Sequence, residues 1–86
     1  MEARVKEALR GKLDDLGVFV DSVVLEKENG QQYLRVCLDS EDIIDLDKVV
    51  LATKIIDPII DELDLVLDEY ILEVYGKSKG SDINER

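Results

Sequence analysis

The first apolar pattern of the chain has helical spacing. Apolar side chains recur every three or four residues at Val5, Ala8 or Leu9, Leu13 and Leu16. This spacing places them on one face of a helix. Gly17 follows the last of them, where a helix often ends in a left-handed residue. The pattern therefore predicts a helix over residues 2–16.

The next two segments have the pattern of strands. Residues 18–27 are rich in β-branched side chains, which favour a strand. Asn29-Gly30 then supplies the pair that a tight hairpin favours. Residues 33–39 alternate, so one face carries Leu34, Val36 and Leu38, and the other carries Tyr33, Arg35, Cys37 and Asp39. We expect the aliphatic face to lie under the helices.

A second helix and a third strand complete the pattern. Asp45 or Asp47 can cap a helix through the segment LDKVVLATKIIDPIIDEL. Pro58 cannot donate a hydrogen bond to Lys54, so we expect a kink or a break into a short second piece near Asp57. Residues 61–68 are expected to loop back. Residues 69–75 are expected to form a strand with Tyr70, Leu72 and Val74 inward.

These elements predict one small α+β domain. Their order is α-β-β-α-β, and a three-stranded sheet with two helices on one face makes a two-layer sandwich. We expect the domain to occupy residues 1–75 and a polar, frayed tail to occupy residues 76–86.

The net charge of −10 is concentrated in one part of the chain. Between Asp39 and Glu73 there are twelve acidic residues and only two basic ones, Lys48 and Lys54. Acidic and basic residues cancel in the remainder. Phosphate contacts need Lys or Arg, so this distribution argues against strong, direct nucleic-acid binding and favours a basic partner.

The residue types needed for catalysis or metal binding are scarce. The chain has no histidine, and its one cysteine, Cys37, has no imidazole to activate it. The acidic stretches do not match a calcium loop. We therefore expect no enzyme activity, no cofactor and no metal site. The start of the chain has no apolar core like that of a signal peptide, and no apolar run could span a bilayer, so we expect a cytoplasmic location.

The second helix carries apolar residues on two sides. One broad side is formed by Leu46, Val49, Val50, Thr53, Ile56 and Ile60, and we expect it to face the sheet. Leu51, Ile55 and Ile59 fall on nearly the opposite side. Either another element covers this strip or Pro58 re-phases the helix, or it is an exposed protein-contact surface. If the strip is exposed, Asp57, Asp61 and Asp64 would belong to the same protein-contact surface.

Several segments resemble the N-terminal domain of RimP, the bacterial ribosome maturation factor. They run in family order as Leu16-Gly17, Val20-Asp21-Ser22-Val23, Leu34-Arg35-Val36-Cys37-Leu38-Asp39, Ile44-Asp45-Leu46-Asp47, Pro58 and Tyr70-Ile71-Leu72-Glu73-Val74. The family continues into an SH3-like second domain, which we expect this chain to lack. The chain is then expected to be either an excised first domain or a short homologue.

The resemblance implies a function without catalysis. RimP proteins assist maturation of the small ribosomal subunit and are not enzymes. Together with the acidic segment, this predicts a domain that contacts a basic ribosomal protein or a pre-30S particle through an acidic face. The alternative is a freestanding acidic interaction module, either a homodimeric regulator or an inhibitor that mimics a polyanion.

Overall fold

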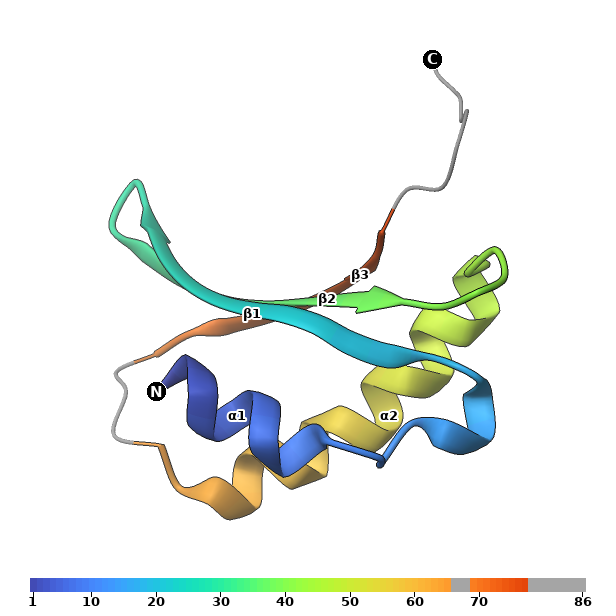
Figure 1. Cartoon of the computed structure of the whole chain (residues 1–86). Coiled ribbons are helices and arrows are strands. Elements are labelled where there is room, and N and C mark those ends of the chain that lie inside the picture. The colour runs from blue at the N-terminus through green and yellow to red at the C-terminus, as the bar shows by residue number, and fades with distance from the viewer. Residues whose placement is uncertain (66–68, 78–86) are drawn as a thin grey trace.

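The computed structural model describes residues 1–65 and 69–77, which form two helices on one face of a three-stranded sheet (Figure 1). The predicted α+β order is confirmed. The elements in chain order are α1 (Glu2–Leu9), a 3₁₀ turn η1 (Asp14–Leu16), β1 (Phe19–Glu28), β2 (Gln31–Asp39), α2 (Leu46–Leu63) and β3 (Ile71–Gly76). The expected loop at residues 66–68 and most of the expected tail, residues 78–86, lie outside the described residues.

β2 is the central strand of the sheet. It pairs antiparallel with β1 and parallel with β3, and Lys77 N extends the second pairing by donating to Leu38 O at 2.7 Å. Asn29 and Gly30 both have positive φ, 50° and 79°, as a tight hairpin between twisted strands requires. The predicted hairpin is confirmed.

The alternation along β2 separates the core from the open face of the sheet. Leu34, Val36 and Leu38 are fully buried under the helices, as the sequence predicted. Arg35 and Cys37 face the other side, beside Glu73 and Tyr75 of β3. The remaining buried core residues come from α1, the segment after it, β1 and α2: Val5, Leu9, Leu13, Val18, Val23, Ala52, Ile56 and Ile60.

The expected single helix over residues 2–16 is wrong beyond Leu9. Arg10 is extended, with ψ 126°, and Gly11 is left-handed, with φ 74°, so the chain leaves the helical path there. Glycine adopts this conformation without the steric cost of a Cβ atom. Leu13, the residue before η1, is still buried in the core. Gly17 is left-handed at the end of η1.

α2 begins as predicted but is not broken. Asp45 caps it by accepting a hydrogen bond from Lys48 N at 2.9 Å. The helix is continuous through Pro58 to Leu63, so the expected break is wrong, and residues 61–63 are helical rather than part of a loop. Pro58 is exposed. The carbonyl that loses its donor therefore lies on the solvent side, where water can satisfy it.

α2 is rotated relative to the predicted orientation. Leu46 and Val50, expected to face the sheet, are 76% and 45% exposed. Ile55 and Ile59, on the opposite side of the helical wheel, are partly buried against the core cluster. α1 contributes Val5 and Leu9 to that cluster and contacts α2 as well as β1. The second contact moves the buried stripe of α2 towards α1 and exposes the flank on the side of β3.

Each of the two edge strands of the sheet, β1 and β3, contacts another segment of the chain. β1 has a register shift between Val20 and Ser22, and its Leu25 N donates to Glu2 Oε2 at 2.8 Å. At the end of β3, a Cβ atom on Gly76 would lie 3.2 Å from the Ile44 side chain. The loop before α2 is therefore closely packed on the last residue of β3.

Candidate protein-contact surface

The predicted acidic contact residues all lie on the C-terminal half of α2 or at its end. Asp57, Asp61 and Asp64 are exposed, and Glu62 is exposed beside them. We call these four residues the α2 acidic surface. Among residues 1–65 and 69–77, no Lys or Arg forms an ion pair with any of them. Their charges are thus available to a partner.

The position of the α2 acidic surface is unfavourable for the helix itself. The C-terminal end of a helix carries a partial negative charge, so carboxylates there are repelled and basic residues are favoured. The last turn of α2 contains no basic residue. Asp57 and Asp61 are also four residues apart, a spacing at which like charges destabilise a helix. Stability of the fold therefore does not explain these side chains.

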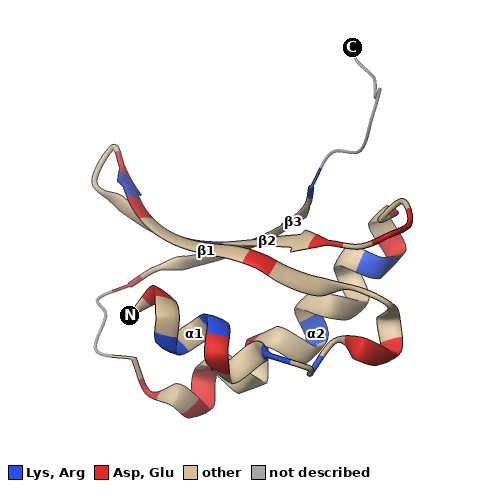
Figure 2. Ribbon diagram, viewed as in Figure 1, with Lys and Arg blue, Asp and Glu red and all other residues tan. Residues whose placement is uncertain are grey.

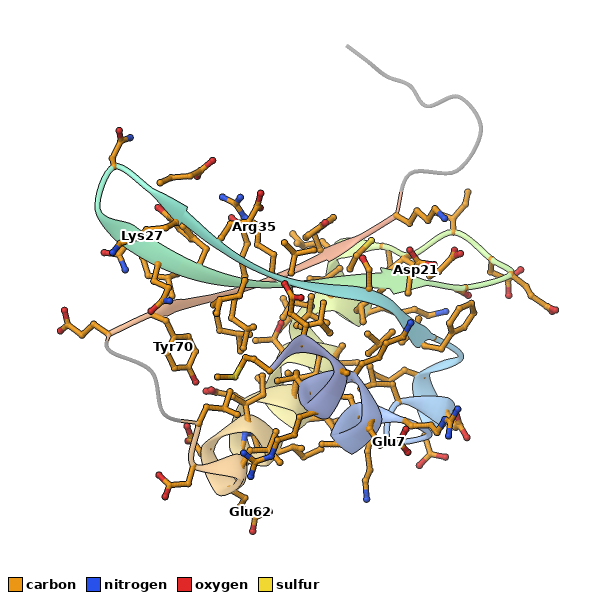
Figure 3. The ribbon with its side chains drawn as sticks, turned by 60° about the vertical axis from the view of Figure 1, so that its left-hand side comes forward. Glu7, Asp21, Lys27, Arg35, Glu62 and Tyr70 are labelled. Carbon is orange, nitrogen blue, oxygen red and sulfur yellow. The ribbon has the colours of Figure 1, made fainter. Side chains whose placement is uncertain are left out.

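Tyr70 shows that part of the α2 acidic surface faces β3. Burial, followed by the negative charges of Asp61 and Asp57, raises the pKa of the Tyr70 phenol. Figure 3 shows the Tyr70 ring directed from the start of β3 towards α2, whereas Glu62 points away from the sheet. Asp57 and Asp61 therefore lie on the flank of α2 that faces β3.

The predicted apolar strip is open only at one end. Leu51 is 47% exposed, whereas Ile55 and Ile59 are partly buried and pack against the core. The strip as a whole is therefore not an exposed ridge. Its role in partner contact stays a prediction, and only Leu51 could take part without a change in packing.

The structure exposes two residues that the helical wheel assigned to the core, together with an apolar residue of the preceding loop. Leu46 and Val50 are exposed on α2, and Ile43 in the loop before it is 78% exposed. Leu46 and Val50 are four residues apart, so they are neighbours on one flank. The signal that could have found them was the mixed apolar character of both flanks. The rotation of α2 could not be deduced from its own sequence.

A second charged group, on the open face of the sheet, was not predicted as a unit. Arg35 donates to Glu26 at 2.6 Å, to Glu28 at 2.9 Å and to Glu73 at 2.6 Å. Its guanidinium carbon also lies 4.7 Å from the centre of the Tyr33 ring. We call Arg35 and the three glutamates the Arg35 cluster; it lies on the face of the sheet away from the helices (Figure 3). The hydrogen bonds to Glu28, Glu26 and Glu73 raise the pKa of Arg35 above its ordinary value.

The carboxylates of the sheet and those of α2 differ in whether a basic side chain pairs with them. Figure 2 shows acidic positions in the loop before α2 and towards both ends of that helix, while basic positions recur along α1. On the sheet, Lys77 lies within 4.0 Å of carboxylate oxygens of Asp21 and Asp39. Carboxylates of the sheet are thus paired with Arg35 and Lys77, and those of α2 are not.

The described residues offer little for other kinds of site. They contain no group of three or more His, Cys, Asp or Glu side chains arranged to hold a metal ion. A pocket of about 510 Å³ between α1 and β1 is lined by Lys6, Glu7, Arg10 and Phe19, among others, and Glu7 is bonded to Arg10 at 3.4 Å. No helix in the described part of the chain is both long and apolar enough to cross a membrane.

The chain is similar to a known protein family over most of its length. The family model of the RimP N-terminal domain matches residues 5–80, which covers α1 from Val5 onwards, the whole sheet and α2.

Proposed function

The chain belongs to the family of RimP N-terminal domains, and from this premise we propose that it acts without catalysis in small-subunit assembly, by contacting a basic ribosomal protein. RimP proteins are ribosome maturation factors, so a role in ribosome maturation follows from family membership. The proposal adds the subunit, the kind of contact and the face that makes it. It places this activity in the cytoplasm, where ribosomal subunits mature.

The observation that carries the proposal is the unpaired charge of the α2 acidic surface. Asp57, Asp61 and Asp64 are exposed and have no ion-pair partner within the described residues, and Asp61 and Asp64 also oppose the dipole of their own helix. Residues that reduce the stability of a helix without an internal partner are typical of a binding surface. A basic protein would supply the missing positive charge, with most of the effect on association rate and orientation.

Direct, strong binding to RNA is not part of the proposal. The net charge of −10 repels phosphate. Arg35 is engaged by three glutamates, and Arg10 by Glu7. A gel-shift assay with fragments of small-subunit ribosomal RNA at about 150 mM salt should show no complex. A tight complex at that salt would contradict this part of the proposal.

The test is co-sedimentation of the domain with purified precursors of the small subunit at low and moderate salt. The Asp57→Asn/Asp61→Asn double variant should lose binding to the precursors. Any binding that remains should depend less on the salt concentration. The matched control is Asp14→Asn/Asp15→Asn, which removes the same charge from exposed residues of η1. The control should bind like the unaltered domain. Equal loss in both variants, or no loss in either, would overturn the proposal.

A further inference from the structure

β3 has an open main-chain edge in the described part of the sheet. It pairs with β2 on one side, and Lys77 N points towards β2 because it donates to Leu38 O. Successive residues of a strand turn their N–H and C=O groups to opposite sides. Leu72, Val74 and Gly76 therefore direct their main-chain donors and acceptors away from β2. Such a row is a template for another extended chain.

Apolar side chains flank this edge on both faces of the sheet. Leu72 and Val74 are only partly buried on the helix side, and Ile71 and Tyr75 are 47% and 43% exposed on the open side. A strand laid along β3 would shield all four. It would thus gain main-chain hydrogen bonds and apolar burial together.

The exposed flank of α2 runs beside the same edge. Asp57 and Asp61 follow Val50 by seven and eleven residues, so the three residues form one stripe along the helix. α2 contacts β3, and the Tyr70 ring at the start of β3 is directed towards α2 (Figure 3). The negative charges of Asp61 and Asp57 raise the pKa of its phenol, in agreement with a position of this stripe on the β3 side. Leu51 and Glu62 form a second stripe, about 100° further round the helix. Side chains of an added strand that point towards α2 would meet Val50 and the two carboxylates.

The charge of this surface selects its occupant. If two copies of the chain paired through β3, the Asp57 and Asp61 stripes of both would approach each other. Glu73 would also lie near the junction, with its carboxylate already bound to Arg35. Like charges brought together in this way oppose self-association. An extended segment with Lys or Arg alternating with apolar residues complements both the carboxylates and the apolar positions.

We propose that the β3 edge and the Val50–Asp57–Asp61 stripe of α2 form a strand-addition site for an extended basic segment of a partner protein. This inference rests on the proposed function, since it names how the basic partner binds. The partner segment adds a fourth strand to the sheet beside β3. Its apolar side chains cover Val50 and Val74, and its basic side chains pair with Asp57 and Asp61.

The first test uses a ten-residue peptide in which valine alternates with lysine and arginine. Fluorescence anisotropy should show binding, and amide exchange at Leu72, Val74 and Gly76 should slow in the complex. N-methylation of alternate peptide amides should weaken binding by about tenfold or more, since it removes the edge hydrogen bonds. No binding of the unmethylated peptide, or equal binding of the methylated one, would overturn strand addition.

The second test uses adjacent residues on different flanks of α2. Val50 and Leu51 are almost equally exposed, so Val50→Lys and Leu51→Lys add the same charge at similar structural cost. Val50→Lys should weaken peptide binding by about tenfold, and Leu51→Lys by less than about twofold. Equal effects of the two variants would overturn the proposed location. A dimer of the unaltered chain that Val50→Lys abolishes would assign the site to a second copy instead, and also overturn it.

Co-sedimentation with small-subunit precursors separates this inference from the proposed function. Loss of binding in both Val50→Lys and Asp57→Asn/Asp61→Asn supports strand addition. Loss in the aspartate variant alone overturns strand addition and leaves the proposed function standing. If both variants still bind the precursors, strand addition and the proposed function are both overturned.

Discussion

The Arg35 cluster and the α2 acidic surface contain similar side chains in opposite situations. On the sheet, Glu26, Glu28 and Glu73 surround one arginine at hydrogen-bonding distance. On α2, Asp61, Glu62 and Asp64 lie in or next to the last turn of a helix whose dipole repels them, and Asp57 lies one turn earlier. The first group of acids ties three strands together across the open face. The second group stabilises nothing within the described residues.

This difference shows that net charge alone does not locate a binding surface. Glutamates bound to Arg35 have already given up part of their hydration for a partner within the chain. Carboxylates that are exposed and unpaired keep their full interaction for a partner outside it. Of the acidic residues between Asp39 and Glu73, those on α2 are therefore the more useful for recognition.

Both regions keep their separate roles only while α2 is held in one orientation on the sheet. Ile56 is fully buried between the two layers. Ile56→Ala should lower the free energy of unfolding by about 2–5 kcal/mol, because it removes buried methyl groups and leaves a cavity. Chemical denaturation measures the loss. The control Val50→Ala, on the exposed flank, should have a much smaller effect, and equal losses would contradict the observed rotation of α2.

Removal of charge from the end of α2 should stabilise the protein. Asp61→Asn and Glu62→Gln each remove a carboxylate that opposes the helix dipole. Each should raise the free energy of unfolding by about 0.3–1 kcal/mol at low salt. Thermal and urea unfolding at low and high salt measure the gain, which salt should reduce. A loss of stability in either variant would show that the carboxylate has a stabilising partner.

The same kind of change on the sheet should have the opposite sign. Glu73→Gln weakens the bond to Arg35 at 2.6 Å. Since Glu73 is half exposed, its ion pair is partly screened by water, and the loss should be about 0.2–1 kcal/mol. Urea unfolding, run beside Asp61→Asn, provides the comparison. A gain in stability would mean that Arg35 is satisfied by Glu26 and Glu28 alone.

The smallest expected effect is on the titration of Tyr70. Burial, then Asp61 and Asp57, raise its pKa in the folded protein. The stability linked to the neutral phenol is therefore present below the unfolded pKa of about 10 and is lost as pH rises through the folded pKa. Asp61→Asn should lower the Tyr70 pKa and reduce that loss. NMR titration of the Tyr70 ring measures the shift, and an unchanged pKa would separate Asp61 from the β3 flank.

The sequence predicted most of the fold because the decisive signals were local. Leu34, Val36 and Leu38 alternate with polar residues, Asn29-Gly30 favours one kind of turn, and Asp45 precedes a helix. The prediction of one helix over residues 2–16 was wrong at Gly11. The apolar spacing continues past this residue, although Gly11 adopts a left-handed conformation. The predicted break of α2 at Pro58 was also wrong, because an exposed proline can remain within a helix.

The contact surface was predictable only in part. Asp57, Asp61 and Asp64 are exposed, as residues of an acidic segment are expected to be. The rotation of α2 depends on where α1 packs, so the exposure of Leu46 and Val50 could not be deduced from the helix alone. The Arg35 cluster joins residues from three strands, and its geometry depends on the parallel register of Arg35 with Glu73. Sequence spacing carries no direct record of that register.

The Glu2 carboxylate on Leu25 N has a consequence for the size of any assembly. Together with the irregular pairing between Val20 and Ser22, it blunts the β1 edge for strand pairing. A sheet that can add a strand at only one edge cannot connect two further molecules. Each molecule can take up one extended segment, after which the assembly stops, so complexes should have a fixed one-to-one composition rather than form filaments.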